Sequence, residues 1–181
     1  MKYYLGVDVG GTNIKAGVTD ETGKMILKYS VKTNTKGNGR IIGEQIAMLC
    51  RDVCKRAGIG MNEVSSVGVG IPGTVDPKKG TVVYANNLHL DGEPIGKILE
   101  ELLKKPVFLA NDASCAALGE FVSGSGKEFK SIIMVTLGTG VGGGFVLNGK
   151  LWEGLEGAGG EIGHMVLHVG GEACNCGRKG C

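Results

Sequence analysis

The sequence predicts an α/β protein, in which strands and helices alternate along the chain around a mixed sheet. Short runs of apolar and β-branched residues recur between glycine-rich turns, and three longer segments repeat apolar residues at helical spacing. Of the 181 residues, 42% are hydrophobic and 21% are charged. Those values exclude a disordered chain and a coiled coil.

Three strands precede a helix in the first third of the chain. The expected strands cover residues 3–9, 13–19 and 25–31. A turn near Gly23 joins the second strand to the third. The helix expected over residues 39–56 repeats apolar positions, including Cys50 and Cys54, and Gly58 ends it.

The middle of the chain continues the alternation. Strands are expected over residues 64–71, 81–84 and 107–110. Residues 85–92 are an expected loop, after which Pro94, with a fixed φ that suits a first helical turn, opens a helix over residues 94–104. Asn111 is the expected N-cap of a third helix, which runs to Phe121.

The last part of the chain is predicted to start a second lobe. Strands are expected over residues 132–137 and 145–147, and a turn at Asn148-Gly149 leads to another strand near Leu151. A change of composition places the domain boundary near Asn111, with one lobe over residues 1–111 and a second over residues 112–181. Too few residues remain for a second full layer of helices, so the second lobe is expected to be incomplete.

Charge and hydropathy exclude several classes of partner. Lys and Arg number 20 and Asp and Glu 18, with no basic run, so binding of nucleic acid through bulk electrostatics is not expected. No secretion signal is visible. Residues 131–149 carry no charge but include six glycines, which favours strands and a loop over a membrane span. We therefore expect a cytoplasmic protein that binds neither a membrane nor nucleic acid.

Two glycine-rich turns are candidate phosphate sites. In the first, Gly10 and Gly11 allow a tight turn that points N–H groups at an anion, and Thr12 adds a hydroxyl donor. Asp8 would repel phosphate by itself, so it indicates Mg²⁺ or an ordered water between them. The alternative interpretation is a plain hairpin turn with a capping Asp.

The second glycine-rich segment covers residues 137–144, between two expected strands, and contains Thr139. Two such loops in one chain suggest two jaws that close on one polyphosphate. The segments with the dinucleotide-binding spacing, residues 68–73 and 138–143, do not open a helix, so a Rossmann site is not expected. No P-loop pattern occurs.

Asp112 is a candidate general base. It lies in the first turn of an expected helix, where the helix dipole keeps a carboxylate ionised. An ionised Asp at such a position can accept a hydroxyl proton during phosphoryl transfer. The alternative role is a helix cap.

A zinc site is predicted near the last residue. His164, Cys174, Cys176 and Cys181 form the pattern H-x9-C-x-C-x4-C, and three thiolates with one imidazole make a closed tetrahedral structural site. The alternatives are a disulfide or free thiols, and His168 is a rival fourth ligand.

These motifs together resemble the ROK family of repressors and sugar kinases, and most closely its glucokinase-like members. The resemblance covers the whole chain and implies the actin-like, ribonuclease H-like α/β fold. It also implies an ATP-dependent hexose kinase that uses Mg²⁺ and a structural Zn²⁺, and that often forms homodimers.

The resemblance also implies roles for individual residues. The residues implied to bind the ATP phosphates and Mg²⁺ are Asp8, Gly10, Gly11, Thr12 and Lys15 in one loop, and Gly138, Thr139 and Gly140 in the other. Those implied to bind the sugar are Gly73, Asn86, Asn111, Asp112, Glu161 and His164, with Asp112 the catalytic base. His164 and the three nearby cysteines, Cys174, Cys176 and Cys181, match the zinc ligands of the family.

The chain departs from the family pattern after Cys181. The family continues to another sugar-binding glutamate and to the helices that hold adenine, so we expect this chain to be a truncated kinase whose independent catalysis is in doubt. A sugar-sensing repressor would need a DNA-binding segment before the first strand, which begins by Tyr3. A non-catalytic sugar-binding module of the same family is the remaining alternative.

Overall fold

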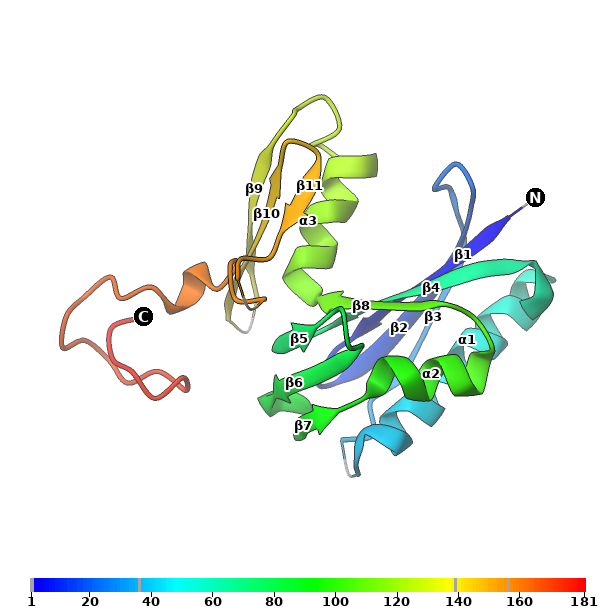
Figure 1. Cartoon of the computed structure of the whole chain (residues 1–181), viewed down its shortest axis with the longest axis horizontal. Coiled ribbons are helices and arrows are strands. Elements are labelled where there is room, and N and C mark those ends of the chain that lie inside the picture. The colour runs from blue at the N-terminus through cyan, green and yellow to red at the C-terminus, as the bar shows by residue number, and fades with distance from the viewer. Residues whose placement is uncertain (1, 36, 139, 156) are drawn as a thin grey trace. The chain divides into compact units, whose positions relative to one another are not determined.

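The computed structural model describes residues 2–35, 37–138, 140–155 and 157–181 (Figure 1). The chain divides into two compact units, Met1–Asp112 and Ala113–Cys181. Each unit is described by itself below. Within the described ranges, no helix is long and apolar enough to cross a membrane.

A five-stranded mixed sheet forms the centre of the first unit. Its strand order is β3-β2-β1-β4-β8. The strands are β1 (Tyr3–Val9), β2 (Asn13–Asp20), β3 (Met25–Lys32), β4 (Val64–Ile71) and β8 (Val107–Asn111). The first three form an antiparallel meander, and β4 is parallel to both β1 and β8. The carboxyl ends of β1, β4 and β8 therefore meet at one edge of the sheet.

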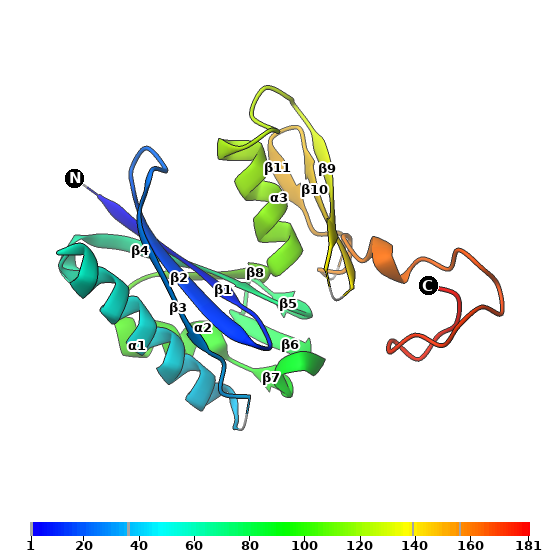
Figure 2. The ribbon, with the colours of Figure 1, turned by 180° about the vertical axis from the view of Figure 1, so that it is seen from behind.

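Helices α1 (Gly39–Ala57) and α2 (Ile95–Leu103) pack on this sheet, and both lie on the same side of it (Figure 2). The Asn38 side chain caps the start of α1 by accepting a hydrogen bond from the Ile41 N–H, and Gly58 ends the helix in the left-handed region. The predicted helix over residues 39–56 is thus confirmed. Alternate residues of β1, namely Leu5, Val7 and Val9, are buried in the core.

A second, small sheet corrects the prediction for residues 85–92. It contains β5 (Thr74–Asp76), β6 (Thr81–Ala85) and β7 (Leu90–Glu93), and the short 3-10 helix η2 (Asn86–Leu88) joins the last two. The predicted loop is wrong because Leu90 pairs with Ala85 and both are buried. Pro94 also precedes α2 instead of occupying its first turn. Another 3-10 turn, η1 (Met61–Glu63), leads into β4.

The second unit is a three-stranded antiparallel sheet with one helix against it, followed by a long irregular segment. The elements are α3 (Asp112–Ser123), β9 (Ile132–Leu137), β10 (Val141–Leu147), β11 (Lys150–Trp152) and the 3-10 turn η3 (Ile162–His164). The strand order is β11-β10-β9. Phe145 and Trp152 pack edge to face across β10 and β11, with ring centroids 5.7 Å apart.

The prediction that residues 137–144 form one long glycine loop is wrong, because β10 already begins at Val141. Its glycines allow close packing. A Cβ on Gly144 would lie 2.5 Å from the Ala117 Cβ on α3, and one on Gly143 would lie 2.6 Å from the Ile162 side chain. Both approaches are closer than side chains tolerate, so these glycines serve the packing of the sheet. Among the described residues, β9 ends at Leu137 and β10 begins at Val141.

Candidate functional site

The first glycine turn lies at the carboxyl end of β1, between β1 and β2. Asp8 and Lys15 are directly opposite each other on these strands, and the Lys15 Nζ lies 3.1 Å from the Asp8 Oδ2. Both side chains are more than half exposed, so their pairing adds little stability. The structure thus places one carboxylate and one ammonium beside the turn, where both remain accessible to a charged ligand.

Gly73 and Asn111 meet at the carboxyl ends of β4 and β8. The Asn111 Nδ2 donates a hydrogen bond to the Gly73 carbonyl over 3.0 Å. Gly73 has a φ of 91°, and a Cβ there would collide with the Tyr84 carbonyl, so only glycine fits this position. Tyr84 in turn donates its hydroxyl proton to the Asn86 Oδ1 over 3.3 Å. Gly73 thus lies against both the Tyr84 backbone and the Asn111 side chain, Asn86 bonds to Tyr84, and Asp112 follows Asn111 directly.

Asn87, which no motif in the sequence singles out, lies next to the first glycine turn. A Cβ on Gly11 would lie 3.5 Å from the Asn87 Cβ and 3.5 Å from its carbonyl oxygen. Asn87 therefore joins the phosphate-type turn to the segment that carries Asn86. The only signal in the sequence is the Asn86-Asn87 pair, which does not reveal which of the two faces the turn.

The second glycine segment is a tight turn between β9 and β10. The Gly138 N–H donates to the Gly140 carbonyl over 2.9 Å, and no atom lies within 4 Å of a Cβ built on either glycine. Backbone in such open space can approach a ligand closely. Thr139, the predicted hydroxyl donor of this segment, lies outside the described residues.

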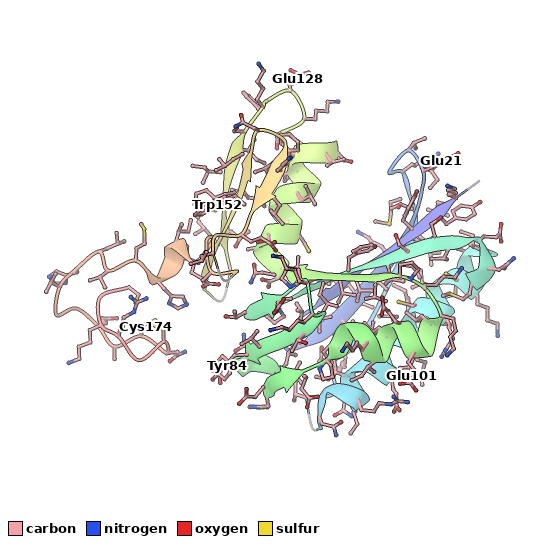
Figure 3. The ribbon with its side chains drawn as sticks, viewed as in Figure 1. Glu21, Tyr84, Glu101, Glu128, Trp152 and Cys174 are labelled. Atoms are coloured by element: carbon pink, nitrogen blue, oxygen red, sulfur yellow. The ribbon has the colours of Figure 1, made fainter. Side chains whose placement is uncertain are left out.

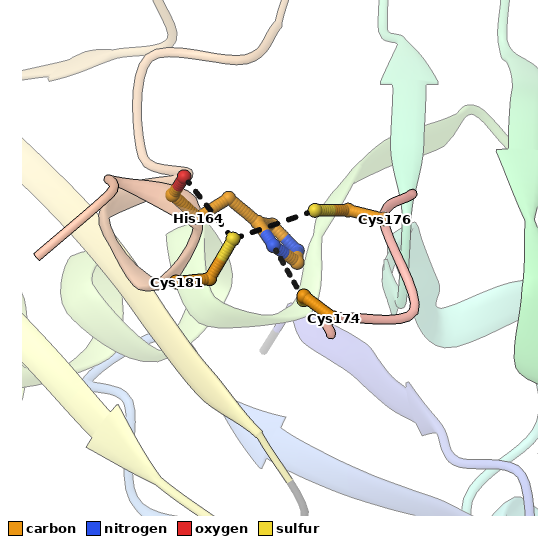
Figure 4. Close-up of side chains that lie close together, drawn as sticks. All are labelled: His164, Cys174, Cys176 and Cys181. Atoms are coloured by element: carbon orange, nitrogen blue, oxygen red, sulfur yellow. Dashed lines mark hydrogen bonds between the residues drawn. The ribbon is translucent and has the colours of Figure 1, made fainter. Parts of the chain in front are cut away.

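The four predicted zinc ligands converge at the end of the second unit (Figure 4). One ligand atom each from His164, Cys174, Cys176 and Cys181 lies within 4.8 Å of all the others. The Cys174 Sγ is 3.7 Å from the His164 Nδ1, and the Cys176 Sγ is 3.5 Å from the Cys181 Sγ. Ligand atoms about 2.3 Å from a tetrahedral zinc lie roughly 3.5–3.8 Å apart, so this donor set fits the ion.

The predicted rival ligand, His168, does not belong to this group of four among the residues that the structure describes. Its carbonyl accepts a hydrogen bond from the Gly171 N–H, and its own N–H donates to the Gly180 carbonyl. Its backbone thus braces the loop that carries the cysteines.

The two exposed cysteines of the cluster, Cys176 and Cys181, have pKa values shifted in opposite directions. A hydrogen bond from the Arg178 backbone N–H, with further ones from neighbouring thiols, lowers the pKa of Cys176 to about 6. Desolvation of its sulfur, together with the hydrogen bond to Cys176, raises the pKa of Cys181 to about 11. The lowered pKa favours the thiolate form of Cys176, which is the form that binds metals.

Arg178 and Glu161 flank the histidine ligand. The Arg178 guanidinium donates to the His164 carbonyl over 3.1 Å. The Glu161 Oε2 lies 3.8 Å from the His164 Nε2, on the ring edge opposite the nitrogen that faces Cys174. A carboxylate at the outer nitrogen is the usual partner of a metal-binding histidine, because it fixes the ring and its tautomer. Figure 3 shows Cys174 in the irregular segment of the second unit.

Fold and candidate site together define an α/β protein with two glycine turns and a cluster of three cysteines and one histidine that could hold a metal ion. Comparison with known proteins identifies the family. The ROK family profile matches residues 4–181, and the chain belongs to the ROK family, as the motifs predicted.

The chain is similar to several sugar kinases. It is 39% identical to the glucokinase of Halalkalibacterium halodurans, over 99% of this chain and 55% of that protein. Among solved structures, it matches the ROK glucokinase of Streptomyces griseus in complex with glucose and AMPPNP, with a TM-score of 0.88, 37% identity, and coverage of 99% and 55%. The ROK hexokinase of Thermus thermophilus matches with a TM-score of 0.85, 39% identity, and coverage of 99% and 58%.

These matches confirm the predicted actin-like α/β fold. The chain spans about half the length of the curated relatives it matches.

Proposed function

We propose that this chain supplies the sugar-binding and phosphate-binding part of an ATP-dependent hexose kinase, which phosphorylates the 6-hydroxyl of glucose or a related hexose. One observation carries the proposal. The parallel strands β1, β4 and β8 end at the same edge of the sheet. The first glycine turn, Gly73 and Asp112 follow those ends, and Asn111 is the last residue of β8. Ligands of open α/β sheets bind at such an edge.

In the proposed reaction, Asp112 takes the proton from the sugar 6-hydroxyl. The oxygen attacks the γ-phosphorus of ATP, a new O–P bond forms, and the bond to the bridging oxygen of ADP breaks. Because the transition state of phosphoryl transfer is loose, a weak but well-placed base suffices. Mg²⁺, when bound with ATP, would neutralise phosphate charge beside Asp8.

The other proposed roles follow the resemblance. Two sets of residues hold the phosphates: Gly10, Gly11, Thr12 and Lys15 in one turn, and Gly138, Thr139 and Gly140 in the other. Sugar hydroxyls are held by Gly73, Asn86, Asn111, Glu161 and His164. Polar groups that lose their partners with the wrong sugar would provide discrimination. The zinc ligands, His164, Cys174, Cys176 and Cys181, fix the loop that carries His164 and Glu161.

Substitution of Asp112 tests the proposal in a protein of the relatives' full length. Asp112→Asn should lower the rate of hexose phosphorylation by about 10²–10⁴-fold, because an amide cannot accept the proton. Sugar binding, measured by calorimetry, should persist. Asp91→Asn, the same chemical change at an exposed position of β7, is the matched control and should leave turnover unchanged. Near-normal turnover of Asp112→Asn would reduce Asp112 to a helix cap.

A non-catalytic sugar-binding or sensing module of the same family is the second candidate. The same coupled assay, run on the 181-residue chain with glucose, fructose, mannose and N-acetylglucosamine, separates the two. Sugar binding without phosphorylation at any ATP concentration would favour the module. The proposed setting for either is a cytoplasmic homodimer without a membrane or nucleic-acid partner, and sedimentation of the purified protein tests the dimer.

A further inference from the structure

Thr33, the residue directly after β3, fastens the first glycine turn from outside the strand pair that forms it. Its hydroxyl donates to the Gly10 carbonyl over 2.6 Å. Its backbone N–H donates to the Thr12 carbonyl over 2.9 Å. One residue thus holds the carbonyls on both sides of Gly11, and it does so from a half-buried position 23 residues away along the chain.

These two hydrogen bonds determine where the N–H groups of the turn point. A trans peptide is planar, and its N–H lies opposite its C=O. Fixing the Gly10 carbonyl toward Thr33 therefore directs the Gly11 N–H away from Thr33. The Gly10 N–H is itself used inside the turn, where it donates to the Asn13 carbonyl over 2.9 Å. An anion-binding turn is effective when its donors are oriented before the ligand arrives.

Gln45 on α1 holds the backbone around Thr33 in place. The Gln45 Oε1 accepts from the Asn34 N–H over 3.0 Å, and its Nε2 donates to the Lys32 carbonyl over 2.6 Å. The side-chain amide thereby pairs with the backbone on both sides of Thr33, as a neighbouring strand would. Its helix is anchored in the core next to it, where Ile46 is fully buried.

We infer that Thr33 is a positioning residue for the phosphate loop at residues 10–12, and that Gln45 holds it there from α1. The inference rests on the proposed function, because the loop's ligand is taken to be a polyphosphate. The Thr33 hydroxyl does not need to touch that ligand. It acts through the Gly10 carbonyl, and the hydroxyl is therefore the part of the side chain that matters.

The test is an NMR titration of the isotope-labelled 181-residue chain with magnesium tripolyphosphate, a probe that needs no adenine site. In the unsubstituted chain, the amide resonances of Gly11 and Thr12 should move on binding. Thr33→Val keeps the shape but removes the hydroxyl, and should weaken the apparent affinity about fivefold to tenfold, as expected for one lost hydrogen bond. Thr33→Ser restores a hydroxyl and should return the affinity to within about twofold of the unsubstituted chain.

Thr22→Val is the matched control. The Thr22 hydroxyl also makes one hydrogen bond of 2.6 Å, to the Asp20 Oδ1, but at the β2–β3 turn. This variant should bind the probe like the unsubstituted chain. If Thr33→Val does not fold, Gln45→Met, which removes both hydrogen bonds beside Thr33 and keeps the length of the side chain, should weaken binding in the same direction.

The outcomes distinguish failure of the role of Thr33 from failure of the phosphate assignment of residues 10–12. Equal affinities of the unsubstituted chain, Thr33→Val and Gln45→Met would overturn the role of Thr33 and leave the phosphate loop intact. Failure of Thr33→Ser to recover the affinity would also overturn it, because the hydroxyl would then not be the active group. If the probe moves no resonance at residues 10–12 in the unsubstituted chain, the phosphate assignment of the loop fails, and this inference fails with it.

Discussion

The two units of the chain support their site residues in different ways. In Met1–Asp112, the buried side chains form one continuous apolar cluster from Leu5 to Leu109. In the described part of Ala113–Cys181, the buried apolar side chains are Ala113, Ala117 and Val146. The first unit therefore holds its glycine turn and the Gly73–Asn111 contact against a packed core. The second unit holds its candidate site largely through turns, backbone hydrogen bonds and a cluster of four metal-type ligands.

From this difference we expect the last part of the chain to depend on the cysteine cluster for its order. The segment after η3 has one isolated bridge, Ala173 with Lys179, and a few turn hydrogen bonds. A segment with so little buried apolar surface cannot offset its conformational entropy. A bound metal would supply the missing free energy, because structural zinc contributes to folding directly.

Removal of the metal should produce the largest difference in order between the two units. We expect about one zinc per chain by elemental analysis of protein purified without added metal. Binding of zinc to three thiolates and one imidazole is worth on the order of 10 kcal/mol, so a strong chelator should collapse the amide resonances of residues 164–181. Those of the first unit should keep their dispersion.

Two variants control the metal experiment. Cys176→Ser should lower the zinc content to near zero, whereas Cys115→Ser, a thiol on α3 outside the cluster, should leave it at one. A metal-free protein with a disulfide between Cys176 and Cys181 or between Cys174 and Cys181 would contradict this prediction and support the disulfide alternative.

The first unit should depend on its apolar core for stability, and truncation of a core side chain tests this. Leu99 on α2 is fully buried, and Leu99→Ala should lower the free energy of unfolding of the first unit by about 2–5 kcal/mol. Leu137→Ala is the same change on β9, where the side chain is 82% exposed, and should change stability by less than about 0.5 kcal/mol. Urea denaturation of both variants checks the difference. Equal losses would mean that the exposed strand is as tightly packed as the core.

The sequence predicted those parts of the molecule that depend on local pattern. The strand at Tyr3–Val9, the helix at Gly39–Ala57 with its terminating Gly58, and the spacing of the metal ligands each follow from residues close together in the chain. Local patterns were sufficient because burial alternates along the strand and repeats along the helix with the periods that side chains impose.

Errors and omissions occurred where long-range contacts decide. Residues 85–92 look like a loop until Ala85 pairs with Leu90. Gly143 and Gly144 look like loop glycines, although they are needed where Ile162 and Ala117 approach the strand. Asn87 and Thr33 carry no motif, and only the fold brings them to the first glycine turn. Sequence spacing cannot reveal a contact between residues whose distance is set by sheet topology.

The smallest expected effect concerns the outer face of β9. Ile133, Val135 and Leu137 are 65%, 53% and 82% exposed, and an apolar strand face of this kind promotes association between chains. We therefore expect the 181-residue chain to self-associate. The double change Ile133→Thr and Val135→Thr keeps β-branched side chains while adding hydroxyls, so stability should change by only about 1 kcal/mol. The associated fraction should fall clearly in sedimentation velocity.

Changes elsewhere make this last prediction specific to the strand face. Val83→Thr, an equally conservative change at an exposed position of β6 in the first unit, should leave association unchanged. If Val83→Thr reduces association as much as the β9 variant, the contact does not lie on β9. If the unsubstituted chain is a monodisperse monomer, the exposed face of β9 does not promote association, and this prediction is wrong.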